Sequence, residues 1–206
     1  PLQSRALTPT IAPDRFNPFP LSMTLAHFPG RDPFRMAAWR APRGMRGWLT
    51  DDSSLTARIR ARCGQFSLQV VFQGKGAVLP DELAALGVHR HGSVWQREVL
   101  LIADGEPVVF ARSLVAETAV PAAWHLLRGL GGRPLAAVLF DDPRVRRAPL
   151  EAARLDARDS RWHHAARATG HDALPALWAR RSAFHRGGVP LLITEIFLPA
   201  VLNLAP

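Results

Sequence analysis

Residues 94–115, VWQREVLLIADGEPVVFARSLV, decide the fold of this chain. Apolar residues dominate 94–102 and 108–115, as expected of two long strands. Between them stands Asp104-Gly105, the commonest two-residue signal for a tight hairpin turn. The stretch therefore predicts a pair of antiparallel strands joined at that turn.

The expected pairing of this hairpin brings two arginines together. If Asp104 and Gly105 are the two turn residues, Arg97 lies directly opposite Arg112. Because side chains alternate along a strand, both arginines belong to one face of the sheet. The other residues of that face are apolar: Trp95, Val99, Leu101, Val108, Phe110 and Leu114.

Two opposed arginines on an apolar face need compensation, because like charges directly opposite each other destabilise a sheet and a buried, unpaired guanidinium is costly. Nearby carboxylates such as Glu98 or Glu106, or solvent, could supply it. Both acids, however, have the opposite parity and point to the other face. A ligand with two carboxylates would satisfy the arginines through paired, charge-assisted hydrogen bonds. We therefore hypothesise a two-carboxylate clamp formed by Arg97 and Arg112.

A second anomalous charge stands in residues 191–198, LLITEIFL. Glu195 shares a face with Ile193 and Phe197, so alternation encloses its carboxylate among apolar side chains. A carboxylate in that setting needs a cationic partner or must hold a proton, and either state suits a site that handles a hydroxyl or a proton. The alternative is a salt bridge to one of the two strand arginines that only neutralises both partners.

The rest of the chain predicts further elements around the hairpin. Capping residues precede Leu55 and Ile59, which indicates a short amphipathic helix, and alternation over 66–72 indicates a strand. Long strands joined by hairpins, with helices between them, predict an α+β fold with a single antiparallel sheet. The remaining expectations are a short helix or turn at 80–86, helices from Pro121 and from Pro134, one or two surface helices with a variable loop over 141–181, and a last strand at 189–198.

The first 45 residues predict an extension, because prolines at 13, 18, 20, 29, 33 and 42 interrupt any helical or strand period. We expect 1–45 to be poorly ordered and 46–206 to form one domain, which a chain of 206 residues can support. An Arg-rich, acid-poor leader is typical of an organelle-targeting peptide. Alternatively, it is upstream sequence included by a misassigned start, since Met23, Met36 and Met45 could each initiate translation.

The net charge of +9 does not predict nucleic-acid binding. Seven of the 26 basic residues and two of the 17 acidic residues lie in 1–50, so that segment carries +5 and the remainder +4. No cluster of basic residues on a recognisable motif appears, and Lys75 is the only Lys.

The cysteine and histidine content bears on the expected compartment and on metal binding. Cys63 is the only cysteine and cannot form an internal disulfide, which fits a reducing cytoplasm. No apolar stretch approaches the length of a membrane-spanning helix, so we expect no membrane insertion. Neither His89 and His91 nor His163, His164 and His171 have acidic or Cys ligands at typical spacing, so we expect no metal.

Several sequence blocks occur in an order that matches a known family. They are residues 95–107 followed by Ala111-Arg112-Ser113; Gly132-Arg-Pro134-Leu135 with Leu139-Phe140; Leu177-Trp178-Ala-Arg180-Arg181-Ser182; and Pro190-Leu-Leu-Ile-Thr194-Glu195-Ile-Phe197-Leu-Pro199. Over about 48–200, these blocks together resemble the chorismate pyruvate-lyase family, whose members form 4-hydroxybenzoate.

The resemblance implies an antiparallel sheet with helices packed on one side and a product pocket that flaps close off from solvent. It implies that Arg97 grips the ring carboxylate and that Glu195 meets the 4-hydroxyl. Leu55 and Leu135 correspond to the flap residues that bind substrate or product. The Pro/Arg-rich leader and an expanded segment at 155–176 depart from the family's pattern.

Residues and resemblance together predict a cofactor-free carbon–oxygen lyase. It would act as a cytoplasmic monomer and convert chorismate to 4-hydroxybenzoate and pyruvate, the first step supplying the ubiquinone ring. Arg97 would hold the ring carboxylate and Arg112 the enolpyruvyl group, with Glu195 orienting the 4-hydroxyl. The alternative is a non-catalytic domain that senses aromatic carboxylates, as in transcription regulators of similar fold. Such a domain normally follows a helix-turn-helix, which the Pro-rich leader cannot supply.

Overall fold

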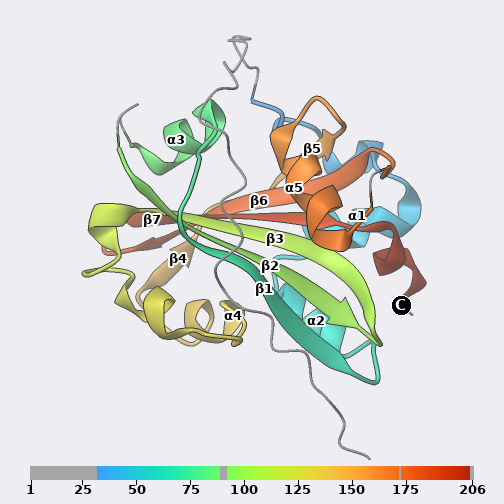
Figure 1. The fold of residues 1–206 in the computed structure, drawn as a ribbon, viewed down its shortest axis with the longest axis horizontal. Helices are drawn as coiled ribbons and strands as arrows, with labels where there is room; N and C mark the ends of the chain where they lie inside the picture. The colour runs from blue at the N-terminus through green and yellow to red at the C-terminus, as the bar shows by residue number, and fades with distance from the viewer. Residues whose placement is uncertain (1–31, 89–91, 172, 205–206) are drawn as a thin grey trace, which may run out of the picture.

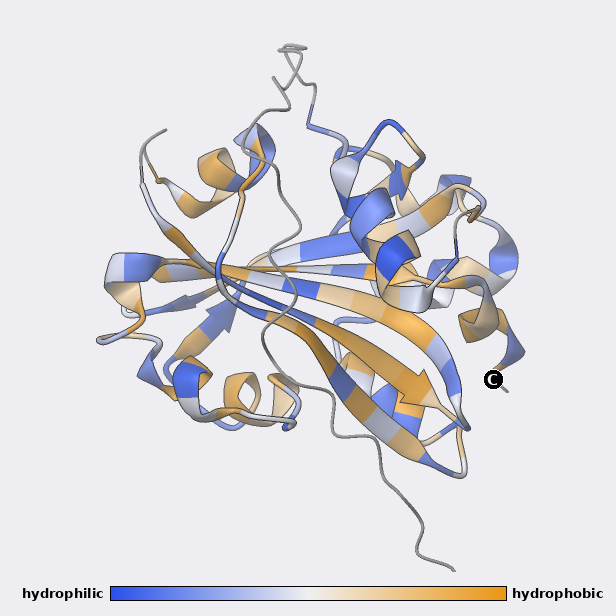
Figure 2. Ribbon diagram, in the orientation of Figure 1, coloured by the Kyte–Doolittle hydropathy of each residue, from blue (hydrophilic) through white to orange (hydrophobic). Residues whose placement is uncertain are grey.

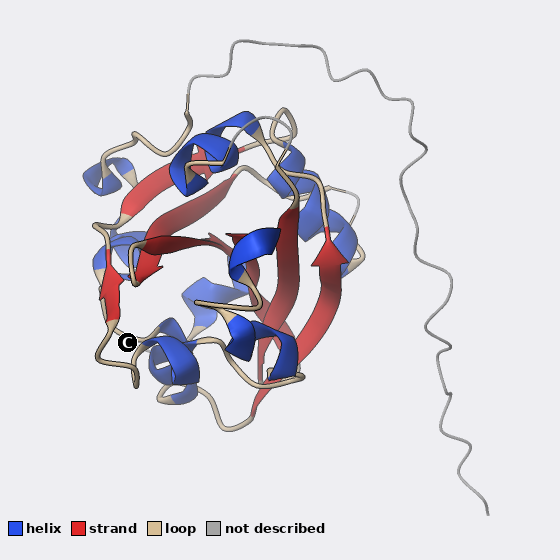
Figure 3. Cartoon of the chain, turned by 90° about the vertical axis from the view of Figure 1, so that its left-hand side faces the viewer, coloured by secondary structure: helices blue, strands red, loops and turns tan. Residues whose placement is uncertain are grey.

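The computed structural model describes residues 32–88, 92–171 and 173–204. They form one seven-stranded antiparallel sheet surrounded by helices (Figure 1). The strand order is β1-β2-β3-β7-β6-β4, and β5 also pairs with β6. The predicted fold class, α+β with a single antiparallel sheet, is therefore confirmed. In Figure 3 the strands run in clearly different directions, which is the twist expected of a sheet of this size.

The sheet contains, in chain order, β1 (Phe66–Lys75), β2 (Val94–Ala103), β3 (Glu106–Ala116), β4 (Val145–Arg147), β5 (Glu151–Leu155), β6 (Leu177–Arg186) and β7 (Val189–Phe197). The α-helices are α1 (Arg43–Thr50), α2 (Leu55–Arg60), α3 (Pro80–Leu86), α4 (Ala136–Leu139) and α5 (Ser160–Thr169). Short 3-10 helices lie at η1 (Ala38–Arg40), η2 (Glu117–Ala119), η3 (His125–Gly129) and η4 (Pro199–Asn203). No helix of the described residues is long and apolar enough to cross a membrane.

The predicted hairpin of β2 and β3 forms at the expected turn. Asp104 and Gly105 are the two turn residues, and both have positive φ, 51° and 86°. These angles are those of the turn that Asp-Gly favours, because its twist matches that of the flanking strands. Ala103 pairs with Glu106 across the turn, as predicted.

The register beyond the turn differs from the prediction by one residue. Next to Pro107 the β2–β3 ladder contains a β-bulge: Ile102 pairs with Pro107, whereas Leu101 pairs with Val109. As a result, Arg97 pairs with Ser113 and Arg112 pairs with Glu98. A shift of one residue turns every following side chain to the other face. The expected Arg97–Arg112 pair is therefore wrong, and the two arginines point to opposite faces of the sheet.

The helices cover both faces of the sheet, and not only the one side that was expected. Helices α1 and α2 pack on the face that bears Val99 and Leu101, whereas α5 packs on the face that bears Leu100 and Phe110. In Figure 1, α3 and α5 lie in the upper half of the view, and α2 and α4 lie in the lower half. Two separate layers of side chains are thus buried, one on each face.

The sequence analysis missed strands in the segment 141–181. Helices and a loop were expected there, but only α5 is helical, and β4, β5 and the start of β6 occupy the rest. The α-helix expected from Pro121 is also absent, because that stretch forms turns and η3. Its apolar residues are nevertheless buried, since Trp124, Leu127 and Leu130 belong to one hydrophobic cluster.

Residues 32–45 pack into the fold, although they were expected to belong to a poorly ordered extension. Phe34 is only 1% exposed, and the guanidinium groups of Arg161 and Arg181 lie over its ring at 5.0 and 4.3 Å. Helix α1 begins at Arg43, within that segment, and buries Met45. The folded region therefore begins before residue 46. Residues 1–31 lie outside the described residues.

A band of polar residues crosses the middle of the apolar sheet. Figure 2 shows hydrophilic segments in the central parts of long strands that are otherwise largely hydrophobic. The members of this band are buried despite their polarity. They are Gln96, Arg97 and Glu98 on β2, Arg112 and Ser113 on β3, Arg180, Arg181 and Ser182 on β6, and Thr194 on β7.

The burial of Phe34 predicts a large loss of stability on truncation. Phe34→Ala should lower the free energy of unfolding by about 3–5 kcal/mol, because it removes a buried aromatic ring and leaves a cavity. Chemical denaturation at equilibrium measures the change. The matched control is Trp39→Ala, at a side chain that is 67% exposed and should change stability by less than about 0.5 kcal/mol. Equal effects of the two substitutions would contradict the assignment of Phe34 to the core.

Candidate active site

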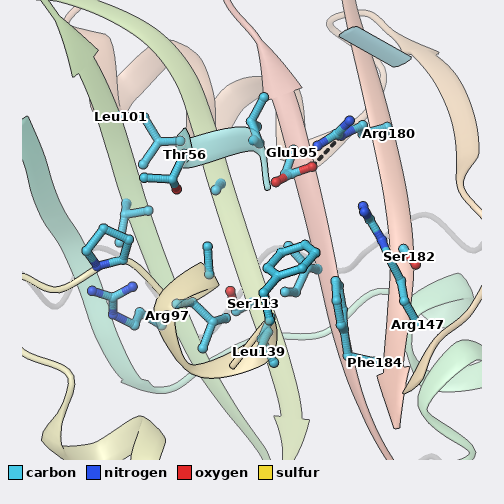
Figure 4. A pocket seen from close by; sticks show the side chains of 18 of the residues that line it. Thr56, Arg97, Leu101, Ser113, Leu139, Arg147, Arg180, Ser182, Phe184 and Glu195 are labelled. Atoms are coloured by element: carbon cyan, nitrogen blue, oxygen red, sulfur yellow. Dashed lines mark hydrogen bonds and ion pairs between the residues drawn. The ribbon is translucent and has the colours of Figure 1, made fainter. Parts of the chain in front are cut away.

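A pocket lies on the face of the sheet that bears Arg97 (Figure 4). Its floor is formed by side chains from β1, β2, β3, β7, β6 and β4, and its other walls come from residues in and before α2 and α4. Four of the residues predicted for the site line this pocket: Arg97, Glu195, Leu55 and Leu135. They are brought together from four separate parts of the chain.

Arg97 enters the pocket from β2 with its side chain almost fully buried. It is 1% exposed, and its Nη2 donates to the carbonyl oxygens of Gly131 (2.8 Å) and Arg133 (3.2 Å). Its Nε is buried and has no hydrogen-bond partner. Burial lowers the pKa of Arg97, and among the described residues no carboxylate forms an ion pair with it. The guanidinium is therefore held in place but not neutralised.

Glu195 lies on β7 and pairs with a different arginine from the two considered in the sequence analysis. Its cross-strand neighbour is Arg180 on β6, whose Nε donates to Glu195 Oε2 at 2.5 Å. Arg180 is 1% exposed, and its Nη1 also donates to the carbonyl oxygens of Trp48 (2.9 Å) and Asp51 (2.6 Å). The position of the Glu195 carboxylate is thus fixed by a buried cation, while its side chain remains 17% exposed in the pocket.

Arg147, on the short strand β4, supplies a third guanidinium to the pocket. It lies over the ring of Phe184 at 5.1 Å, and its Nη1 donates to the carbonyl oxygen of Asp52 at 2.5 Å. Its Nε is buried without a partner, like that of Arg97. Burial lowers the pKa of Arg147, and the charge of Glu195 partly opposes this effect.

Arg147 and Arg180 were missed in the sequence analysis for one reason. Both lie in the segment that was expected to form helices and a loop, so neither was assigned to a strand face. The signal for Arg180 was its position next to Arg181, since neighbouring residues on a strand point to opposite faces. Arg181 does point away from the pocket, toward Asp32, Asp81 and Glu151.

The predicted role of Arg112 in the site is wrong. The bulge turns Arg112 to the opposite face, where Nε lies 3.0 Å from Glu82 Oε1 and Nη1 lies 2.7 Å from Glu98 Oε1. His164 on α5 contacts the same Glu98 oxygen at 2.8 Å. Burial would raise the pKa of Glu98, but His164 and Arg112 together lower it. Arg112 is thus the centre of a buried ion network that ties α3 and α5 to the sheet.

Leu55 and Leu135 line the pocket from outside the sheet. Leu55 is the first residue of α2, whose N-cap residue Ser54 accepts a hydrogen bond from the N–H of Ala57. Leu135 immediately precedes α4. Both leucines are less than 9% exposed, so they contribute apolar walls to a site whose floor carries the charges.

Histidines do not form a second site in the described part of the chain. No group of three or more His, Cys, Asp or Glu side chains there is arranged to hold a metal ion. His163 and His171 contact backbone carbonyl oxygens, of Ala157 and Thr169. His89 and His91 lie outside the described residues.

The charges of the pocket favour an anionic ligand. Its charged lining residues are Arg97, Arg147, Arg180 and Glu195, so three positive charges face one negative charge and the excess is +2. Arginine is the side chain best suited to hold carboxylates, because its planar donors match the two carboxylate oxygens.

The fold and this pocket define a protein with a positively charged cavity between a sheet and two covering helices, suited to a small anionic molecule. The sequence profile of the family described as Chorismate lyase matches residues 37–204. The chain therefore belongs to the chorismate lyase family and is a lyase.

Relatives of high identity support this assignment. A protein named "Probable chorismate pyruvate-lyase" from Aromatoleum aromaticum is 54% identical over 166 residues, which cover 80% of this chain and 90% of the relative. A protein of the same name from Thiobacillus denitrificans is 47% identical and covers 81% and 88%, respectively.

Solved structures show the fold alone. The effector domain of PhnF from Mycobacterium smegmatis matches with a TM-score of 0.50 at 19% identity, over 71% of this chain and 89% of that chain. A structure titled PhnF from the same organism matches with a TM-score of 0.51, also at 19% identity, over 72% of this chain and 65% of that one.

The buried ion network of Arg112, Glu82 and Glu98 predicts that Arg112 stabilises the folded protein. Arg112→Met should lower the free energy of unfolding by about 3–5 kcal/mol, because it leaves the carboxylates of Glu82 and Glu98 buried without their cation. Thermal or chemical denaturation measures this loss. The triple variant Arg112→Met/Glu82→Gln/Glu98→Gln removes the uncompensated charges and should recover part of it. A single variant as stable as the wild type would show that the network contributes nothing.

The same network predicts a pH dependence of stability. Because the pKa of Glu98 is lowered in the folded protein, its contribution is complete above about pH 4.3, the ordinary value of a glutamate. It is lost as the pH falls through the lower, folded value. Glu98→Gln should therefore flatten the acid side of a plot of unfolding free energy against pH. An unchanged acid limb would contradict this contribution.

Proposed function

We propose that this protein splits chorismate into 4-hydroxybenzoate and pyruvate and so performs the first step supplying the ubiquinone ring. The observation that carries the proposal is the +2 excess of the pocket in a member of this family. Chorismate has two carboxylates, one on the ring and one on the enolpyruvyl side chain. Its charge therefore matches the excess of the pocket.

Arg97 would hold the ring carboxylate. Its Nη2 is already engaged with Gly131 and Arg133, which fixes the plane of the guanidinium before the ligand arrives. The unpartnered Nε then remains for a carboxylate oxygen. A group oriented in advance loses little freedom on binding, so the ligand gains more from each hydrogen bond. Leu55 and Leu135 would cover the ring.

Glu195 would receive the 4-hydroxyl. Arg180 binds Oε2 of Glu195, so Oε1 can accept the hydroxyl proton without moving the side chain. With the ring carboxylate at Arg97 and the hydroxyl at Glu195, both ends of the ring are fixed, which places C3 and C4 reproducibly.

The reaction balances without any added reactant. The bond between C3 and the ether oxygen breaks, the hydrogen leaves C4, and the ring becomes aromatic as 4-hydroxybenzoate. The departing enolpyruvyl group takes up that hydrogen at its methylene carbon and becomes pyruvate. Aromatisation supplies the driving force, so the pocket needs to align the enolpyruvyl group with C4 and to exclude other conformations.

A second candidate function is the sensing of aromatic carboxylates without turnover. The likeness to the PhnF effector domain motivates it, but that likeness concerns the fold alone. The two functions differ in one observable. A sensor would bind chorismate or 4-hydroxybenzoate and leave chorismate intact.

The experiment that tests the proposal is to incubate the purified protein with chorismate, without added metal or nucleotide, and to separate the products by chromatography. We expect equal amounts of 4-hydroxybenzoate and pyruvate. Formation of 3-hydroxybenzoate or salicylate would contradict the proposed regiochemistry. Chorismate that is bound but unchanged would favour the sensor.

The proposed role of Arg97 predicts that its substitution strongly lowers turnover. Arg97→Ala should lower kcat/KM for chorismate on the order of 10³-fold, because charge-assisted hydrogen bonds to the ring carboxylate are lost. Steady-state kinetics measures the change. Arg154→Ala is the matched control, since it removes the same charge from an exposed position on β5. A variant of Arg97 with the kinetics of this control would refute the assignment.

A further inference from the structure

We propose that Arg147 is the anchor of the second carboxylate, the one on the enolpyruvyl group, and that it takes no part in holding the aromatic product. This inference rests on the proposed function. It replaces Arg112, which lies on the other face of the sheet, with a residue of the pocket itself.

The buried and half-buried arginines of the fold differ in their partners. Arg112, Arg161, Arg180 and Arg181 each form an ion pair with a carboxylate of the chain. Within the described residues, Arg97 and Arg147 donate their hydrogen bonds only to backbone carbonyl oxygens. Both line the pocket, and each has a buried Nε without a partner. The pocket thus contains two guanidinium groups that form no ion pair with a carboxylate of the described residues.

Among the arginines of the pocket, only Arg97 and Arg147 combine a buried Nε without a partner with the lack of an ion pair in the described residues. Arg58 also has a buried Nε without a partner, but it forms an ion pair with Asp51 and does not line the pocket. Arg180 does line the pocket, but Glu195, Trp48 and Asp51 occupy its Nε and Nη1 donors. Arg147 is therefore the remaining cation for a second anionic group.

The positions of the charges along the sheet fit the shape of the substrate. Arg97 lies on β2, Glu195 on β7 and Arg147 on β4, so the strand order places Glu195 two strands from each arginine. Each of these steps is about 10 Å along the sheet, and the side chains of both arginines reach inward across part of it. Figure 4 shows Arg97 and Arg147 on opposite sides of the pocket, with Glu195 between them.

The substrate has the same order of groups. If Arg97 holds the ring carboxylate and Glu195 holds the 4-hydroxyl, the ether oxygen on C3 lies next to the position of Glu195. The enolpyruvyl carboxylate then extends beyond Glu195, toward the side of the pocket where Arg147 lies (Figure 4). Arg147 would draw this carboxylate away from the ring and so turn the methylene carbon toward C4, where the hydrogen is removed.

The surroundings of Arg147 hold its guanidinium in place. The ring of Phe184 lies below it, and the carbonyl oxygen of Asp52 accepts one of its hydrogen bonds. Asp52 precedes α2, whose first residue, Leu55, also lines the pocket. A purely structural role would therefore be to tie the chain before α2 to β4. The two roles make different predictions for ligands with one and with two carboxylates.

The test compares binding and turnover in Arg147→Met. We expect kcat/KM for chorismate to fall on the order of 10²-fold, because one charge-assisted carboxylate contact is lost. The Kd for 4-hydroxybenzoate, measured by calorimetry, should stay within about twofold of the wild-type value, because that product has only the ring carboxylate. Arg97→Ala should weaken both. Arg147→Lys keeps the charge and should restore part of the turnover, and Arg154→Ala should change neither quantity.

Two results would overturn the inference. One is wild-type kcat/KM in Arg147→Met. The other is a parallel loss of 4-hydroxybenzoate affinity, which would indicate a structural role at the pocket wall. The outcome is separable from that of the proposed function. If the wild type binds chorismate without splitting it, the proposed function fails. The Kd values of Arg147→Met for chorismate and for 4-hydroxybenzoate, both measured by calorimetry, then decide whether Arg147 holds the second carboxylate.

Discussion

The structure depends on one constraint: a guanidinium buried in a sheet needs a hydrogen-bond acceptor. The alternation of side chains along a strand determines on which face of the sheet that acceptor must lie. The polar band places charges side by side along single strands, as in Arg97-Glu98 and Arg180-Arg181. Each pair divides between the two faces. On the face covered by α3 and α5, acids of the chain neutralise the arginines. On the other face the one acid, Glu195, pairs with Arg180, and Arg97 and Arg147 are left for a ligand.

A single β-bulge sets this division for β3. Without it, Arg112 would face Arg97, and the carboxylates of Glu82 and Glu98 would be buried without their cation. With it, Ser113 takes the place beside Arg97, and a small hydroxyl side chain leaves room above the sheet. The bulge therefore serves both faces at once, since it completes the ion network on one and opens the pocket on the other.

The sequence predicted those features that depend on local pattern. The hairpin turn, the long strands at 94–102 and 189–198, and the anomalous charges Arg97 and Glu195 all follow from alternation within a few residues. It could not predict which strands pair across the sheet, and Arg147 and Arg180 belong to the site only through the pairing of β4 with β6 and of β6 with β7. The register error at Arg112 has a similar origin, since one extra residue reverses a face but barely changes the pattern. The prolines before residue 46 hide any periodic pattern in the sequence, yet Phe34, Ala41 and Met45 of that segment pack into the hydrophobic clusters.

The excess charge of the pocket has a thermodynamic consequence for ligand binding. Arg97 and Arg147 each keep a buried donor without an acceptor, and burial lowers the pKa of both side chains. Buried, unsatisfied donors destabilise a fold by about 1–3 kcal/mol each, so a ligand that accepts hydrogen bonds from them stabilises the protein. A dianionic ligand would satisfy these donors and restrain the segments that carry Leu55 and Leu135. Binding energy in such a site comes from hydrogen bonds to donors that have no acceptor within the protein. The same hydrogen bonds therefore position the substrate and stabilise the folded protein.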